Sequence, residues 1–175
     1  MIRRILDENL RPEDEVLEIG AGTGFYSFEI ARRCRQLVAL ERAPGMARIL
    51  KGRIARASVT NIRVLECDFF AYRREAAFDV VMAIGVLDGI EDWQPFLDRC
   101  VSLAKRIVIV TVPQFSLWSR FYWVFSKMSR SPARIYKPEE LMNHLNGYRV
   151  EFRETGLRTR FTHGMTLVVV IEKNA

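Results

Sequence analysis

A glycine-rich loop near the start of the chain has the residue types and spacing that bind an organic ligand. Gly20, Gly22 and Gly24 follow the strand-like run EVLEI and precede a helix-like run. Glycines let the backbone turn sharply and approach a ligand closely, and the first turn of a helix leaves N–H groups to bind it. Glu18 stands two residues before the first glycine, and its carboxylate suits an ammonium group better than a pyrophosphate. We therefore expect Glu18 and the loop, with Ala21, to bind a ligand that carries an amino-acid group.

The loop differs from the fingerprint of dinucleotide-binding proteins, GxGxxG. That pattern, counted from Gly20, needs a glycine at position 25, where the chain has Phe25. The chain has GxGxG instead, with the acid in front. A tight turn that binds nothing is the other interpretation, and the strand–loop–helix context argues against it.

The elements that must position this loop alternate along the whole chain. We predict strands at 15–19, 37–40, 62–66, 78–84, 107–112, 149–154 and 165–172, and helices from the loop to about 33, at 44–57, 93–104 and 138–145. Such alternation is typical of a mostly parallel sheet with helices on both faces. Only about ten residues join the last two strands, too few for a crossover helix, so these strands should be antiparallel. We expect a doubly wound, Rossmann-like α/β sheet of seven strands with its last strand reversed.

Length and composition fit one domain over 1–175. The net charge of +6 permits an anionic partner, but a solvated basic surface is the favoured interpretation of the arginines. Cys34, Cys67 and Cys100 form no CxxC pair, so we expect reduced thiols and no metal site. The N-terminus does not read as a secretory signal, and no apolar run is long enough to span a membrane. A cytoplasmic protein is the expectation.

The segment VLEIGAGTGFYS resembles the first motif of the class I S-adenosylmethionine-dependent methyltransferases, of which the small-molecule branch of quinone and tetrapyrrole biosynthesis is the most similar. The resemblance covers most of the chain and also includes the reversed last strand. It implies that Glu41 holds both ribose hydroxyls of S-adenosylmethionine and that Asp68 accepts a hydrogen bond from the adenine amino group. The remaining cofactor-binding residues that we expect are Arg42, Met46, Phe69, Ile84 and Gly85.

The resemblance also limits the acceptor. The run Ile84–Gly85–Val86–Leu87 stands where base and glutamine amino-methyltransferases have an Asn/Asp-Pro-Pro-aromatic motif, and no cysteine follows a proline, as cytosine methylation requires. We therefore expect methyl transfer to a small, apolar or aromatic organic molecule rather than to nucleic acid. An RNA methyltransferase and a non-catalytic S-adenosylmethionine-binding protein are the alternatives.

Chain direction selects the candidate substrate and catalytic residues, because ligands bind beyond the carboxyl ends of parallel strands. The final hairpin should place Arg158 and His163 at that edge, with His163 or Tyr26 as a general base if the acceptor arrives protonated. His144 should lie away from the site. The insertion 114–137 carries Trp118, Phe121 and Tyr122 at helical spacing. It would cover the acceptor, form a homodimer contact or lie on a membrane surface.

Overall fold

The structure of the protein is a computed structural model that describes residues 2–74, 76–113, 138–154 and 166–173. The insertion 114–137 and residues Arg158 and His163 lie outside the described residues. The described helices are α1 (Ile2–Asn9), α2 (Ser27–Ala31), α3 (Pro44–Arg56), α4 (Trp93–Leu103) and α6 (Pro138–His144), with the short 3₁₀ helix η1 (Leu87–Gly89). The strands are β1 (Glu15–Ile19), β2 (Gln36–Glu41), β3 (Ile62–Glu66), β4 (Phe78–Ala83), β5 (Ala104–Pro113), β6 (Arg149–Glu154) and β7 (Thr166–Glu172).

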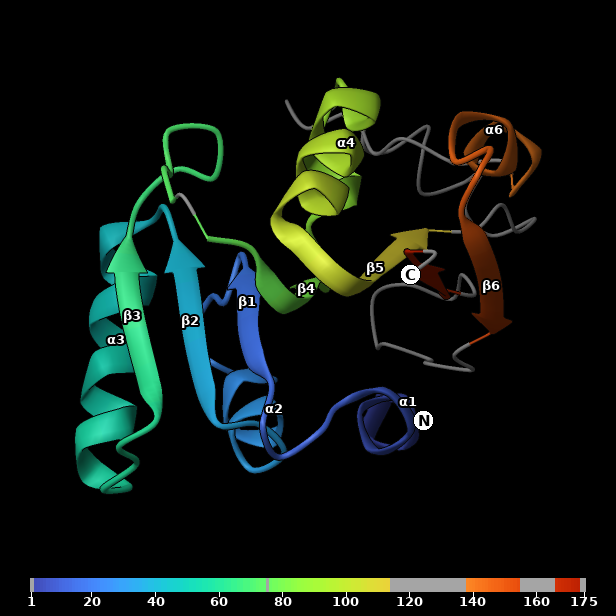
Figure 1. Cartoon of the computed structure of the whole chain (residues 1–175). Helices are drawn as coiled ribbons and strands as arrows, with labels where there is room; N and C mark the ends of the chain where they lie inside the picture. Colours follow the sequence, from blue (N-terminus) through green and yellow to red (C-terminus); the bar gives the residue numbers. More distant parts are fainter. Residues whose placement is uncertain (1, 75, 114–137, 155–165, 174–175) are drawn as a thin grey trace.

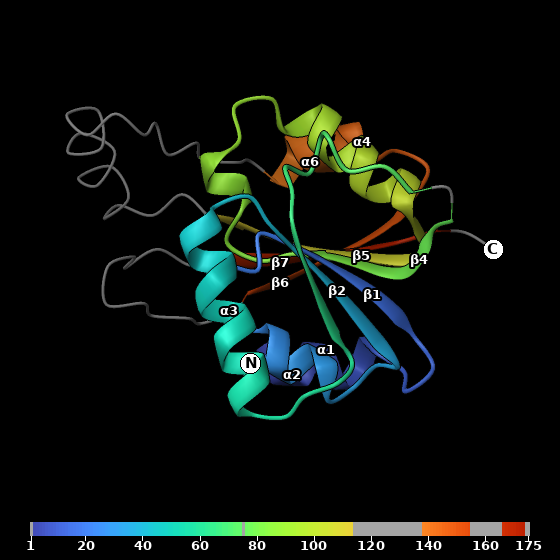
Figure 2. The same ribbon diagram turned by 90° about the vertical axis from the view of Figure 1, so that its left-hand side faces the viewer.

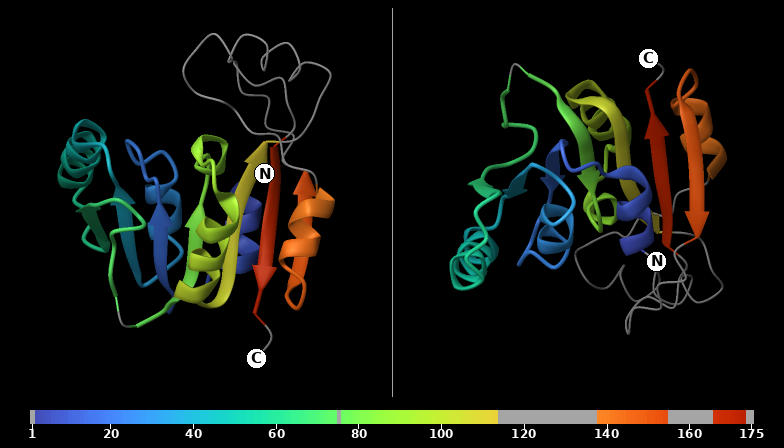
Figure 3. Two further views of the ribbon diagram at one scale, coloured as in Figure 1. Left: turned by 90° about the horizontal axis from the view of Figure 1, so that it is seen from above. Right: turned by 60° about the horizontal axis from the view of Figure 1, so that its bottom comes forward.

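The strands form one seven-stranded sheet in the order β3-β2-β1-β4-β5-β7-β6 (Figure 1). From β3 to β5 all neighbours are parallel, whereas β7 is antiparallel to both β5 and β6. The predicted doubly wound sheet with a reversed last strand is therefore confirmed. Figure 3 shows the strands side by side in this order.

Helices cover both faces of the sheet, with α1, α2 and α3 on one face and α4 and α6 on the other (Figure 2). Successive side chains of a strand point to opposite faces, so two separate cores form. On β1, Val16 packs in the core below α1–α3, and Leu17 packs in the core below α4 and α6. From β1 the chain builds outward to β2 and β3, then returns to add β4 on the other side of β1, so the strand order reverses between β1 and β4. Ligands bind at this kind of reversal, beyond the carboxyl ends of the strands.

The boundaries of several elements differ from the predicted ones. The helix expected to reach about 33 ends at Ala31, because Arg33 N–H donates to the carbonyl of Ile30, three residues back, and tightens the chain into a turn. The fifth strand is longer than expected, Ala104–Pro113, because Ala104 pairs with Phe78 of β4 and Pro113 pairs with Thr166 of β7. Helices α1 and η1 were not expected. No helix within the described residues is both long and apolar enough to cross a membrane.

Candidate functional site

The glycine loop leaves the end of β1 in a conformation that few other residues tolerate. Gly20 has φ +71° and Gly24 has φ +85°, both in the left-handed region. A Cβ on Gly20 would lie 2.6 Å from Val86 Cγ2, and one on Gly24 would lie 2.3 Å from Leu50 Cδ1. Backbone N–H groups of Gly20 and Ala21 both donate to the carbonyl of Leu40 at the end of β2. The loop is therefore packed between β2, α3 and the segment after β4.

Glu41, the last residue of β2, is fixed against this loop. Its Oε2 accepts the Gly22 N–H at 2.7 Å, and its Oε1 accepts the Ala43 N–H, also at 2.7 Å. The residue is only 8% exposed. Each carboxylate oxygen can accept a further hydrogen bond, so this acid is held ready to bind two hydroxyl groups at once.

Glu18 lies deeper, beneath the loop. It is 3% exposed, and its Oε2 accepts a hydrogen bond from the Ser27 hydroxyl at 2.5 Å. The pKa of Glu18 is raised to about 7, mainly by burial and also by the nearby charge of Glu41, while the Ser27 hydrogen bond acts in the opposite direction. Glu18 is thus a buried acid that can change its charge near neutral pH.

A cavity of about 380 Å³ opens at the carboxyl ends of these strands. The predicted cofactor residues that line it are Gly20, Glu41, Arg42, Asp68, Phe69 and Gly85. Lining residues that the sequence analysis did not single out are Ile19, Leu40, Cys67, Phe70, Val86, Gly89, Ile90 and Phe96. The charged residues belong to the segments after β2 and β3, and the wall after β4 is apolar.

Asp68 and Phe69 form the part of this cavity that follows β3. Asp68 Oδ1 accepts the Phe70 N–H at 2.8 Å, which turns the chain and leaves Oδ2 to accept from a ligand. Phe69 is buried against Phe96 of α4, with ring centroids 5.0 Å apart. Arg99 donates to the Phe69 carbonyl from below. This corner of the cavity therefore presents one acidic oxygen beside a fixed aromatic ring.

Gly85 is held on the opposite side by a residue that the sequence analysis missed. The Gly85 N–H donates to the hydroxyl of Thr111 at 2.7 Å, and Thr111 is buried in β5. Gly85 itself has φ +70°. A threonine within the aliphatic run IVIVTV was the available signal, because a buried hydroxyl needs a partner.

The described wall of this cavity does not include the predicted residues Gly22, Ile84, Met46 and Tyr26, nor does it include His144. Gly22 acts on the cavity through its N–H, which donates to Glu41 Oε2. Ile84 packs with the core below α1–α3, and Met46 is 46% exposed in the first turn of α3. Tyr26 is half-buried beside Phe25, and burial raises the pKa of its phenol. His144 pairs with Asp98 of α4 at 2.8 Å.

The cysteines and the acids form no metal centre within the part of the chain that the structure describes. Cys34 and Cys100 are buried free thiols, and burial raises the pKa of both. The site is therefore a partly apolar cavity surrounded by backbone amides, aromatic rings and the carboxylates of Glu41 and Asp68.

Known proteins share both the sequence pattern and the fold. Residues 16–106 match a protein family described as a methyltransferase domain. A protein-L-isoaspartate O-methyltransferase of Methanoregula boonei is 31% identical over 100 residues, which cover 57% of this chain and 45% of the relative. An rRNA adenine N-6-methyltransferase of Saccharopolyspora erythraea is 27% identical over 144 residues, which cover 74% of this chain and 37% of the relative. The chain thus spans under half the length of these curated relatives.

Solved structures extend the likeness over nearly the whole chain. The magnesium protoporphyrin IX methyltransferase of Synechocystis, solved with bound S-adenosylhomocysteine, superposes with a TM-score of 0.80 at 18% identity. It covers 99% of this chain and 80% of its own. The N-methyltransferase NodS of Bradyrhizobium japonicum superposes with a TM-score of 0.75 at 14% identity, covering 99% and 95%. At these identities the likeness shows the shared fold.

Proposed function

The chain belongs to the class I S-adenosylmethionine-dependent methyltransferases, and on this basis we propose that it methylates a small organic acceptor that is apolar or aromatic. The bound cofactor supplies an electrophilic methyl group on a sulfonium centre. The work left to the protein is to align the acceptor with that methyl group and to exclude water from it.

The described residues support a definite placement of the cofactor. Glu41 offers two oxygens, already oriented by the Gly22 and Ala43 N–H groups, to the two ribose hydroxyls. Asp68 Oδ2 would accept from the adenine amino group next to the ring of Phe69. The ammonium group would then lie near the loop above Glu18, and the backbone at Gly85 would pass the methionine moiety.

The apolar half of the cavity carries the proposal about the acceptor. The segment after β4 contributes Val86, Gly89 and Ile90 to the wall, and Phe70 and Phe96 contribute apolar rings beside Phe69; none of these lining residues carries a charge. Pockets for small organic ligands have this character, with a few polar groups to fix orientation. Desolvation in such a compartment favours an apolar or aromatic acceptor over a polyanion.

Other candidate acceptor contacts come from the sequence alone. We propose that Trp118, Phe121, Tyr122 and Arg158 contribute to the acceptor site. A general base is needed only if the acceptor arrives protonated, and His163 is then the candidate that we propose. Tyr26, the other candidate from the sequence, does not line the cofactor cavity.

The acceptor class can be tested by following a labelled methyl group. The protein is incubated with methyl-labelled S-adenosylmethionine and three separate pools: a metabolite extract, isoaspartyl peptides, and ribosomal RNA. We expect label in an organic-extractable molecule of the metabolite pool and background counts in the other two. Label in RNA or peptide would overturn the proposed acceptor class, and no transfer to any pool would favour a non-catalytic binding protein.

A further inference from the structure

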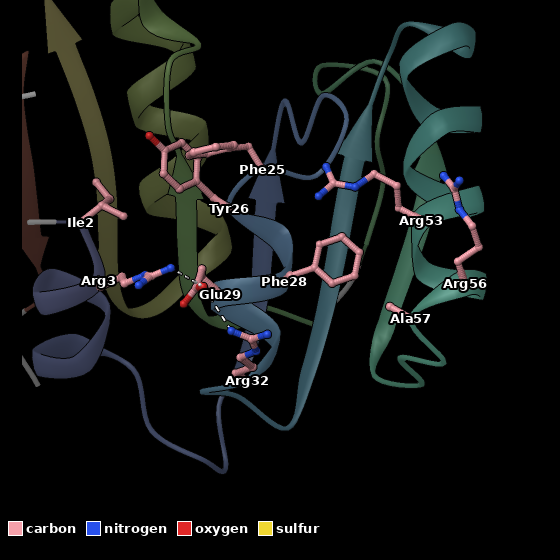
Figure 4. Close-up of a pocket in the computed structure, with 10 residues that line it drawn as sticks. All are labelled: Ile2, Arg3, Phe25, Tyr26, Phe28, Glu29, Arg32, Arg53, Arg56 and Ala57. Carbon is pink, nitrogen blue, oxygen red and sulfur yellow. Dashed lines mark hydrogen bonds and ion pairs between the residues drawn. The ribbon is translucent and has the colours of Figure 1, made fainter. Parts of the chain in front are cut away.

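A second and larger cavity lies among helices α1, α2 and α3 and shares no lining residue with the cofactor cavity. Figure 4 shows its lining residues. The cavity has a volume of about 660 Å³ and is lined by residues of α1, α2, α3 and the end of the glycine loop. We call this cavity the α2 groove; its lining residues are Ile2, Arg3, Phe25, Tyr26, Phe28, Glu29, Arg32, Arg53, Arg56 and Ala57.

The α2 groove is strongly basic. Its lining contains four arginines and one acid, Glu29. Arg3 and Arg32 both donate to Oε1 of Glu29, at 3.1 and 3.2 Å, and their side chains remain 73% and 72% exposed. Arg33 also pairs with Glu29, and with Asp7. Glu29 therefore orients the two groove arginines on this side without matching their charge.

The opposite wall is formed by the last turn of α3, a helix that contains no acidic residue. Arg53 donates one N–H to the Thr23 carbonyl at 2.7 Å, and its guanidinium lies over the Phe28 ring, 5.1 Å from the centroid. Arg56 donates its Nε–H to the Gly52 carbonyl. A guanidinium has five N–H donors, so both arginines keep donors for an anion.

Aromatic rings accompany these charges. Figure 4 shows Phe28 between Arg53 and the Arg3–Glu29–Arg32 group, with Phe25 and Tyr26 at the rim. Phe25 is 75% exposed and is the most exposed of the large apolar side chains described. Its ring and that of Tyr26 form a T-shaped pair with centroids 4.9 Å apart, and this contact leaves most of the Phe25 side chain exposed to solvent. Exposed rings beside arginines are the usual surface for stacked bases with adjacent phosphates.

We propose that the α2 groove binds single-stranded nucleic acid, with phosphates on Arg3, Arg32, Arg53 and Arg56 and a base stacked on Phe25. Arginine forks match phosphate oxygens in geometry as well as charge. This inference goes beyond the proposed function, because it concerns the helical layer and is independent of the acceptor that is methylated. It also departs from the solvated basic surface that the sequence favoured.

The test measures binding of a fluorescein-labelled 12-nucleotide oligouridylate by anisotropy over a series of salt concentrations. Arg32→Glu and Arg56→Glu should each weaken binding about tenfold and reduce the salt dependence by about one counterion. Arg63→Glu is the matched control, because it makes the same change in net charge. Its neighbours on β3, Ile62 and Val64, pack in the core below α1–α3, so Arg63 belongs to the other face of the sheet. This control should change affinity less than threefold.

Phe25→Ala tests the contribution of base stacking to binding separately from that of the arginine charges. Loss of one stacked base should weaken binding roughly fivefold or more at unchanged salt dependence. The proposal is overturned if the wild-type protein does not bind the oligonucleotide, if Arg63→Glu weakens binding as much as the groove variants, or if inorganic triphosphate displaces the strand at equal concentration. Because binding is measured without methyl transfer, these outcomes are distinguishable from a failure of the proposed acceptor.

Discussion

Glu41→Ala should weaken binding of S-adenosylmethionine about ten- to a hundredfold. The variant removes the two oxygens that we place on the ribose hydroxyls, and hydrogen bonds to a charged group contribute about 1.5–3 kcal/mol. It also removes the acceptor of the Gly22 and Ala43 N–H groups. Isothermal titration with S-adenosylhomocysteine measures the effect directly.

Two further variants separate the ribose contact from the loss of loop order. Glu66→Ala is the matched control, because Glu66 is exposed and pairs in register with Glu41 on the neighbouring strand. It should bind the cofactor as the wild type does. Glu41→Gln keeps one acceptor oxygen, so its affinity for the cofactor should lie between those of Glu41→Ala and the wild type. A dissociation constant that is unchanged in Glu41→Ala would refute the ribose assignment.

Glu18→Gln should make the cofactor-free protein more stable by up to about 3 kcal/mol above pH 7. The pKa of Glu18 is raised from 4.5 to about 7, so the folded state binds a proton more readily than the unfolded state. The wild type therefore loses stability as the pH rises from about 4.5 to 7, and each pKa unit corresponds to about 1.4 kcal/mol. Denaturant unfolding at pH 5 and pH 8 should show this slope in the wild type and a smaller slope in the variant.

The same substitution should weaken cofactor binding, because the amide cannot pair with an ammonium group. In the wild type, affinity for S-adenosylmethionine should fall as the pH is lowered from 8 to 6 and Glu18 becomes protonated. Ser27→Ala should move this dependence to higher pH, since the Ser27 hydroxyl lowers the pKa of Glu18. If Glu18→Gln binds the cofactor as tightly as the wild type at pH 8, the acid has no role in binding the ammonium group.

Most of the sheet could be predicted from the sequence because its strands are buried. Runs such as FDVVMA and IVIVTV have few alternatives to a central strand, and the short link between the last two strands determines their direction. Helix α1 was missed for a physical reason. A helix of 8 residues is not stable alone and forms here because Ile2, Ile5 and Leu6 pack into the core below the sheet.

Some residues of the candidate site could be predicted from the sequence, and others could not. The glycine loop, Glu41 and Asp68 follow or end predicted strands, so their place at one edge of the sheet could be predicted. In the structure they line one cavity, and a hydrogen bond joins Glu41 to the loop. Ser27, Thr111 and Phe96 act across elements that are distant in sequence. No spacing pattern connects such residues, so only the folded structure reveals them.

The most direct test of the central claim is to measure the melting temperature with S-adenosylhomocysteine and, separately, with NAD. S-adenosylhomocysteine at one hundred times its dissociation constant should stabilise the folded protein by about 2.7 kcal/mol, or roughly 5–10 °C in melting temperature. NAD at the same concentration should leave the melting temperature unchanged, because the loop has an acid before it and has Phe25 where the dinucleotide fingerprint needs a glycine. Stabilisation by NAD without any response to S-adenosylhomocysteine would contradict the account.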